Sequence, residues 1–396
     1  MVRDALEGNP DLLAAFAELA AARGERRAAS QWKNPEISVE YGKKRVRDGS
    51  GELVGKGEAQ NYLLAQTFEF PGKASLRKAI AERNIEIARL ALEQLRLEIA
   101  ARARRLGVEW IAAEQEARAA REVADRSVTL IAMLARRAPA GVQPLLDQRI
   151  IEASMVEIET RAREAEERRD NAAIALNILR GKPARAPLRL SAPLAPPSVA
   201  ASWESLWGAA REANFALRSR RVEKERAQRA LAQARLESAP DLAIGPFFNQ
   251  ESSGDREKTV GVAAALPLPL WDSGRGKTDA ARARIAQADA ARDQTLREVE
   301  QELAQAHASF LAIRKQLERY PVDDLSRLRE GAELADRQYR LGAVPVQTYL
   351  DMQDRYLAAT AETLRTWVEA HERFVEIQVI TGDGALWSAS KTEERP

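Results

Sequence analysis

The sequence predicts a mostly α-helical protein with a small β part, built from two copies of one unit: a β-hairpin followed by a long α-helical hairpin. Two observations lead to this prediction. Short motifs recur in the same order in both halves of the chain, and apolar residues recur at sevenfold spacing over very long stretches. Aromatic residues make up only 5% of the 396 residues, whereas charged residues make up 30%. This composition is typical of long packed helices, and we expect an extended molecule.

The repeat is visible in two landmarks that return at nearly the same offset. Val142-Gln143 with Leu146-Asp147 returns as Val346-Gln347 with Leu350-Asp351, and Asn34-Pro35-Glu36-Ile37 corresponds to Ala239-Pro240-Asp241-Leu242. We assign the first repeat to residues 1–180 and the second to residues 203–396. Residues 181–202 contain five prolines and are predicted to form an extended linker.

Each repeat is expected to begin with a helix and continue with two strands. The first pair covers about 35–46 and 61–70, and the second covers about 241–250 and 259–270. Ile37, Val39 and Tyr41 alternate with polar residues, so one face of the hairpin is apolar. Glycine-containing loops at 48–51 and 252–255 are predicted to join the strands.

A long helical hairpin follows each strand pair, at about 73–180 and about 275–380. A helix from Lys73 to Arg137 has about 65 residues and a length of about 100 Å. Its packing line has sevenfold spacing and consists of Leu92, Ile99, Leu106, Ala113, Ala120, Ser127 and Leu134. In the second repeat Pro321 predicts a kink or a break, because proline lacks a backbone donor.

Four strands cannot close a barrel, and an isolated pair of hairpins would leave exposed edges. Three copies would supply a 12-stranded membrane β-barrel with an apolar outer face, and twelve helices would continue it as an α-helical barrel. No apolar run is long enough for a membrane-spanning helix. The first residues lack the apolar core of a signal peptide, so we expect that a leader was removed from the native protein.

Several local motifs also point to a family. They are Asn34-Pro35-Glu36-Ile37-Ser38-Val39-Glu40, Phe70-Pro71-Gly72-Lys73, Pro267-Leu268-Pro269-Leu270-Trp271-Asp272, and Tyr339-Arg340-Leu341-Gly342 with Leu350-Asp351. Over nearly its whole length the chain resembles the TolC-like outer-membrane factors of tripartite efflux systems, and within them the CzcC-type subunits of heavy-metal efflux.

This resemblance implies a homotrimer in the outer membrane of a Gram-negative bacterium, with a helical tunnel through the periplasm. It implies a periplasmic adaptor (membrane fusion protein) and an inner-membrane RND-type pump as partners, besides outer-membrane lipid. The implied function is passive conduction of exported substrates, foremost divalent heavy-metal cations. Export of drugs or other organic solutes by the same kind of duct is the alternative.

Three carboxylates follow the turns of the two helical hairpins, namely Asp147, Asp351 and Asp354. Asp351 and Asp354 are one turn apart and are predicted to share a helical face. Three inward-facing copies of Asp351 would form an acidic ring that attracts cations. Stabilisation of the helix N-terminus is the simpler explanation for any single one of them. By the resemblance, Asp351 occupies the position of one constriction carboxylate, whereas Thr348 stands where a second is found, which argues against a tight double ring.

The turns themselves supply further candidates. The resemblance implies that Ala140, Gly141, Leu341 and Gly342 contact the adaptor, although turn chemistry alone would also explain Gly342. Aromatic residues of the strands could lie at the membrane interface, and the candidates are Tyr62, Phe68, Phe70, Phe247 and Phe248.

Other classes of function receive little support. The 61 basic and 59 acidic residues leave a net charge of +2, so no strong field indicates nucleic-acid binding. Cysteine is absent, and His307 and His371 are not at metal-ligand spacing. No set of residues suggests catalysis, so we expect neither an enzyme nor a cofactor. The alternatives of another class are a periplasmic adaptor and a cytosolic coiled-coil scaffold.

Overall fold

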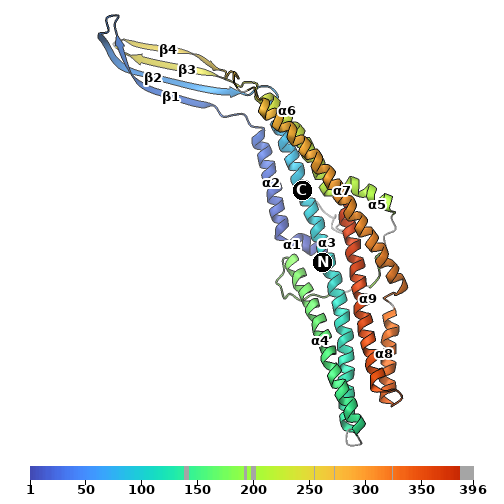
Figure 1. The fold of residues 1–396 in the computed structure, drawn as a ribbon. Helices are drawn as coiled ribbons and strands as arrows, with labels where there is room; N and C mark the ends of the chain where they lie inside the picture. Colours follow the sequence, from blue (N-terminus) through green and yellow to red (C-terminus); the bar gives the residue numbers. More distant parts are fainter. Residues whose placement is uncertain are drawn as a thin grey trace. The chain divides into compact units, whose positions relative to one another are not determined.

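A computed structural model describes residues 1–137, 142–190, 194–197, 202–253, 255–271, 273–322 and 324–383. Figure 1 shows that the chain consists of long helices and a β-sheet. In chain order the elements are α1 (Val2–Gly8), α2 (Pro10–Ala29), β1 (Glu36–Arg47), β2 (Leu53–Phe68), α3 (Lys73–Arg137), α4 (Val142–Leu179), α5 (Trp203–Ala213), α6 (Phe215–Glu237), β3 (Leu242–Ser252), β4 (Arg256–Ala265), α7 (Arg275–Arg319), α8 (Asp324–Arg340) and α9 (Val346–Ile380).

The chain divides into two compact units. One comprises Met1–Ala14, Leu92–Leu217 and Thr295–Pro396, and the other comprises Ala15–Ala91 and Arg218–Gln294. We call them the helical unit and the sheet unit. Each draws on both halves of the sequence, so the division into compact units differs from the division into repeats at residues 1–180 and 203–396.

The sheet is antiparallel, with the strand order β1-β2-β3-β4. Two strand limits differ from the predicted ones by five residues or more. β2 begins at Leu53 instead of about residue 61, because its first residues pair with β1 although they lack apolar alternation. β4 ends at Ala265 instead of about residue 270, since Pro267 and Pro269 have no N–H group to extend the ladder.

The register separates the residues of the sheet onto two faces. Val39, Tyr62, Phe248 and Val260 are paired in one row across the four strands. Because directly paired residues of antiparallel strands lie on the same face, this row defines an apolar face. The neighbouring row on the other face consists of Glu40, Asn61, Asn249 and Thr259. The alternation predicted from the sequence therefore produces one apolar and one polar face.

Asp241 ties the start of β3 to the start of α3 within the sheet unit. The Nζ atom of Lys73 donates to Asp241 Oδ1 at 2.7 Å, and Lys33 donates to Oδ2 at 3.1 Å. The backbone N–H of Phe70 donates to the same carboxylate at 3.1 Å. Burial by itself raises the pKa of Asp241, but the hydrogen bonds from Lys73, Phe70 and Lys33 outweigh it and lower the pKa to about 2.

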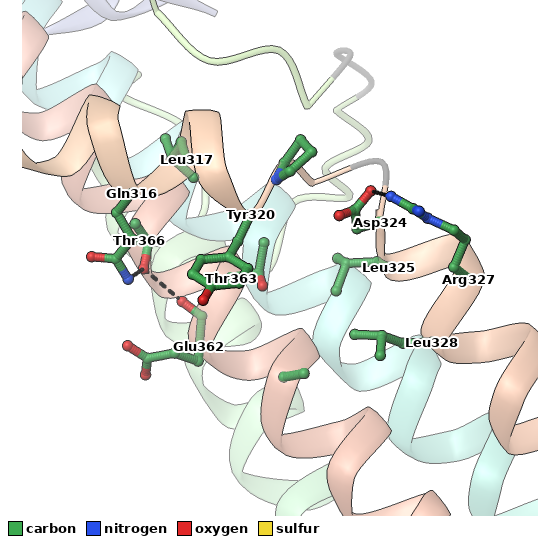
Figure 2. Close-up of a pocket in the computed structure, with 12 residues that line it drawn as sticks. Gln316, Leu317, Tyr320, Asp324, Leu325, Arg327, Leu328, Glu362, Thr363 and Thr366 are labelled. Atoms are coloured by element: carbon green, nitrogen blue, oxygen red, sulfur yellow. Dashed lines mark hydrogen bonds and ion pairs between the residues drawn. The ribbon is translucent and has the colours of Figure 1, made fainter.

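The second long helix is interrupted where Pro321 predicts a break, since α7 ends at Arg319 and α8 begins at Asp324. In the first repeat α3 continues for 65 residues. At this break a groove of about 540 Å³ lies beside α9. Figure 2 shows Tyr320, Leu325 and Leu328 among the residues that line it. Half of its lining residues are apolar or aromatic, and the other half are polar or charged, namely Gln316, Asp324, Arg327, Glu362, Thr363 and Thr366.

Within the described ranges, no helix carries an apolar stretch long enough to cross a lipid bilayer.

Candidate functional site

Four helices of the helical unit meet in one apolar cluster beside the turn between α8 and α9. Leu130 and Leu134 of α3 pack there with Ile151 of α4. Tyr339 at the end of α8 and Tyr349 near the start of α9 complete its centre. Burial of these large side chains fixes the helix ends next to the predicted carboxylates.

Two tyrosines place polar bridges inside this cluster. The hydroxyl of Tyr339 donates to Asp147 Oδ2 at 2.9 Å and so joins α8 to α4. The hydroxyl of Tyr349 lies 3.0 Å from Ser127 Oγ and joins α9 to α3. The two rings stack with their centroids 5.5 Å apart. All four helices are therefore held together by one stacked pair with two hydrogen bonds.

The turn between α8 and α9 exposes the residues predicted to contact a partner. Gly342 has a φ of +76°, a conformation that glycine adopts without strain, and its N–H donates to Tyr339 O at 2.9 Å. Leu341 is 78% exposed. Ala140 and Gly141, the candidates in the other turn, lie outside the described residues.

Asp351 and Thr348 both lie exposed on α9. Asp351 Oδ1 accepts a hydrogen bond of 3.0 Å from Gln347 Nε2, one turn earlier on the helix. Gln347 is also exposed, so this contact leaves the Asp351 carboxylate accessible to ions in solution.

Asp354 differs from Asp351, although the two were predicted to share a face. Asp354 is half-buried, and its Oδ1 lies 3.5 Å from Nη1 of Arg161 on α4. Burial raises the pKa of Asp354, Arg161 opposes this rise, and Glu157 and Asp351 add to it. Asp147 is likewise half-buried and engaged with Tyr339. Of the three predicted carboxylates, only Asp351 is exposed.

Sequence reasoning missed the partners of these carboxylates. Ser127 and Tyr349 occur at helical spacing that indicates only packing, and Arg161 is one of many arginines in α4. Tyr339 could have been found, because it directly precedes the Arg340-Leu341-Gly342 turn motif. Its pairing with Asp147 spans 192 residues, and no local pattern encodes such a contact.

The aromatic candidates do not all lie on one face of the sheet. Tyr62 and Phe248 are paired on the apolar face, where Phe68 also points. Phe247 pairs with Leu63 and Gly261 on the polar face, so it cannot lie beside Phe248 at a membrane interface. Phe70 follows β2 and is 40% exposed. Trp32, which sequence reasoning did not select, meets Phe68 edge to face at 5.9 Å.

The residues that the structure describes contain no group of three or more His, Cys, Asp or Glu side chains placed to hold a metal ion.

Known channel structures share the fold of the chain. CusC superposes with a TM-score of 0.76 at 16% identity, covering 97% of this chain and 91% of CusC. The outer-membrane channel OprN gives 0.75 at 19% identity, with coverage of 97% and 89%. The open state of the MtrE outer membrane channel of Neisseria gonorrhoeae gives 0.75 at 18% identity, with coverage of 96% and 88%. The fold class is thus that of TolC-like channels, a β-barrel continued by an α-helical barrel.

No curated protein matches the sequence significantly. The family described as outer membrane efflux protein matches residues 1–182 and 206–383, which is most of the chain. This family consists of outer-membrane channels of Gram-negative bacteria and not of enzymes. The chain therefore belongs to the outer membrane efflux protein family.

Proposed function

We propose that the chain is one of three identical subunits of an outer-membrane exit duct, which conducts substrates passively and works with a periplasmic adaptor and an inner-membrane RND-type pump. The observation that carries the proposal is the incomplete sheet. Among the described residues, β1 and β4 each pair with a strand on one side only. Open edges favour pairing with further strands, and three copies would supply the twelve strands of a closed barrel.

The apolar face of the sheet supports the same arrangement. Ile37 and Val260 are both 76% exposed, and both lie on β-strands at the open edges. Such a face is stable in lipid, while the polar face with Glu40 and Asn61 suits a water-filled interior. The family's outer-membrane location is consistent with this orientation.

The faces also restrict how two copies would pair. Val39 and Val262 must lie on the same side of the shared sheet, because a slip of one residue would move one of them to the polar face. Pro35 precedes β1 and Pro267 follows β4, and neither has an N–H group to extend a ladder. We call the pairing of β4 of one copy with β1 of the next copy the seam. If the seam ends at these prolines, Val262 lies opposite Val39 of the neighbouring copy.

Cysteine cross-linking tests this seam, since the 396-residue chain contains no cysteine. The double variant Val39→Cys with Val262→Cys should form disulfides between copies and give covalent trimers on denaturing gels. Ser38→Cys with Val262→Cys is the matched control, because Ser38 lies on the opposite face and should cross-link poorly. Light scattering in detergent should give the mass of a trimer. A monomer without cross-links would refute the shared sheet.

The helix ends are proposed as the regulated mouth of the duct. Asp351 would form an acidic ring in the trimer, with Thr348 beside it, and this ring would favour cations. Asp147 and Asp354 would instead hold the helix ends together through Tyr339 and Arg161. Leu341 and Gly342, with Ala140 and Gly141 in the other turn, are the proposed adaptor contacts.

Divalent heavy-metal cations are the proposed substrates, in keeping with the exposed Asp351 and the resemblance to the heavy-metal branch. Export of organic solutes is the second candidate. Deleting the gene in its host should lower the tolerated concentration of zinc, cobalt or cadmium and leave tolerance to organic dyes unchanged. The opposite pattern would favour the organic solutes.

A further inference from the structure

The apolar face of the sheet carries an unexplained group of positive charges near the two hairpin turns. The next row on this face, one step closer to the hairpin turns than the row of Val39 and Val260, runs from Tyr41 on β1 to Lys258 on β4. Gln60 and Gln250 lie between them in this row. The following rows contain Lys43 with Arg256, and then Arg45 with Lys56. We call Lys43, Arg45, Lys56, Arg256 and Lys258 the basic patch.

All five side chains of the basic patch are exposed. The register places them on the apolar face of the sheet, closer to the hairpin turns than the apolar residues. Lys43 follows Tyr41 by two residues, which is about 7 Å along the strand. Within the described part of the chain, none of the five forms an ion pair. Glu58 is the one acidic residue in these rows, and its carboxylate already accepts a hydrogen bond from the hydroxyl of Tyr41.

The opposite face at the same level has no such excess. There Lys44 forms an ion pair with Glu251, and Glu257 is paired in the register with Glu251. The positive charge therefore belongs to the face that would meet lipid and not to the interior of the duct. If both faces of the hairpin ends were in water, nothing would require one face to carry more positive charge than the other.

We propose that the basic patch binds the phosphate groups of lipids in the leaflet that surrounds the hairpin ends of the strands. Lysine and arginine have long apolar stems that can lie along acyl chains while their charged ends reach lipid phosphates. Unpaired cations beside a membrane are costly, and anionic headgroups remove that cost.

The inference rests on the proposed trimer, which also determines which charged residues face each other at the seam between two copies. With Val262 opposite Val39, Lys258 lies opposite Lys43 of the neighbouring copy, and Arg256 lies opposite Arg45. Like charges placed directly opposite each other destabilise a sheet. A lipid phosphate at each seam would neutralise both copies and would join neighbouring subunits.

Binding of labelled lipid A to the full-length protein in neutral detergent tests the inference. The wild type should bind diphosphorylated lipid A at least tenfold more tightly than lipid A without phosphates. The triple variant Lys43→Gln, Arg45→Gln and Lys258→Gln should lose this preference. A matched triple variant in exposed helix positions of the sheet unit, Arg23→Gln, Arg27→Gln and Arg229→Gln, removes the same charge and should retain it.

Equal binding of the two lipids by the wild type would overturn the inference, and so would an unchanged preference in the first triple variant. Displacement of the lipid by inorganic phosphate, at an ionic strength matched with chloride, would indicate a site for small anions and would also overturn it. If the first triple variant does not assemble, the comparison of the two lipids on the wild type still decides. A monomeric wild type would refute the shared sheet, but its preference for phosphate would still test the patch.

Discussion

The Tyr339 hydroxyl and the Asp147 carboxylate are 2.9 Å apart and connect the end of α8 to the start of α4. Tyr339 is largely buried, and its ring stacks on Tyr349, which binds Ser127 of α3. A hydrogen bond to a charged group contributes more to stability than one between neutral groups, so this partly buried contact restrains the helix ends. If the helix ends regulate the duct, weakening this restraint should open it.

Replacing Tyr339 with phenylalanine removes the hydroxyl and retains the ring. The half-buried Asp147 carboxylate then loses a donor, which should cost roughly 1.5–3 kcal/mol locally. We expect a higher mean conductance of single channels in planar bilayers and a lower thermal unfolding temperature. Tyr320→Phe is the control, because Tyr320 is 62% exposed beside the break at Pro321. Equal conductance of Tyr339→Phe and wild type would show that this bond does not restrict the opening.

Asp351→Asn should reduce the selectivity of the channel for cations. The exposed carboxylate contributes a full negative charge near the proposed mouth, and the amide has none. We expect the ratio of potassium to chloride permeability, taken from reversal potentials in a salt gradient, to fall on the order of threefold.

Asp354→Asn provides the matched comparison one turn away on the same helix. The charge of Asp354 is already offset by Arg161, so this variant should change the permeability ratio less than Asp351→Asn does. If Asp354→Asn had the larger effect, Asp354 and not Asp351 would line the conducting path.

Gly245→Ala should prevent the sheet from forming. A Cβ atom at Gly245 would lie 1.7 Å from the backbone oxygen of Leu64 on β2, and a backbone atom cannot move aside without breaking the β2–β3 pairing. Gly42→Ala is the control within the same sheet, since a Cβ atom there has no neighbour within 4 Å. We expect Gly42→Ala to yield wild-type amounts of the assembled protein and Gly245→Ala to yield none. Normal assembly of Gly245→Ala would contradict the close approach of these strands.

Asp241→Asn should destabilise the sheet unit in a pH-dependent way. The pKa of Asp241 is about 2 in the folded protein, below its ordinary value of 3.8. Its contribution, roughly 2 kcal/mol, is therefore present above about pH 4 and is lost as the pH falls towards 2. The difference in unfolding free energy between wild type and Asp241→Asn should be largest near neutral pH and should shrink over this acidic range.

The control for this series is Asp279→Asn, which removes the carboxylate of an exposed ion pair with Arg282 at 2.7 Å. Exposed pairs of this kind contribute little to stability, so the effect should be small at every pH. A constant difference between wild type and Asp241→Asn from pH 7 to pH 2 would show that Lys73 and Lys33 do not hold the carboxylate as described.

Periodic features of the sequence could be predicted well. The alternation of Ile37, Val39 and Tyr41 reports a face of the sheet directly, and Pro321 marks the helix break because its effect is local. The start of β2 at Leu53 could not be predicted, because the pairing with β1 extends the strand through Gly55 and Gly57 without any apolar pattern. Likewise, Phe247 and Phe248 are adjacent and equally aromatic, and only the register assigns them to different faces.

The candidate site was predictable in its residue types but not in its contacts. Asp147, Asp351 and Asp354 all follow helical turns, and the macrodipole gives each the same expected role. The three carboxylates differ in the residues that they contact. Tyr339 and Arg161 are distant in sequence from the carboxylates that they contact, and they reach them only when the helices pack. The basic patch was hidden for the same reason, because its members come from three strands.

The pairing of β2 with β3 has a consequence for how the protein is made. Glu58 and Ser252 meet across 194 residues, and both compact units need segments from both halves of the chain. Contacts of such sequence separation form slowly. A nascent chain that has emerged only as far as the linker at 181–202 therefore lacks the central strand pair of its sheet. The β1–β2 hairpin of such a chain has an apolar face and no β3 to pair with β2. A holding chaperone would have to protect it from aggregation until the second half of the chain has been synthesised.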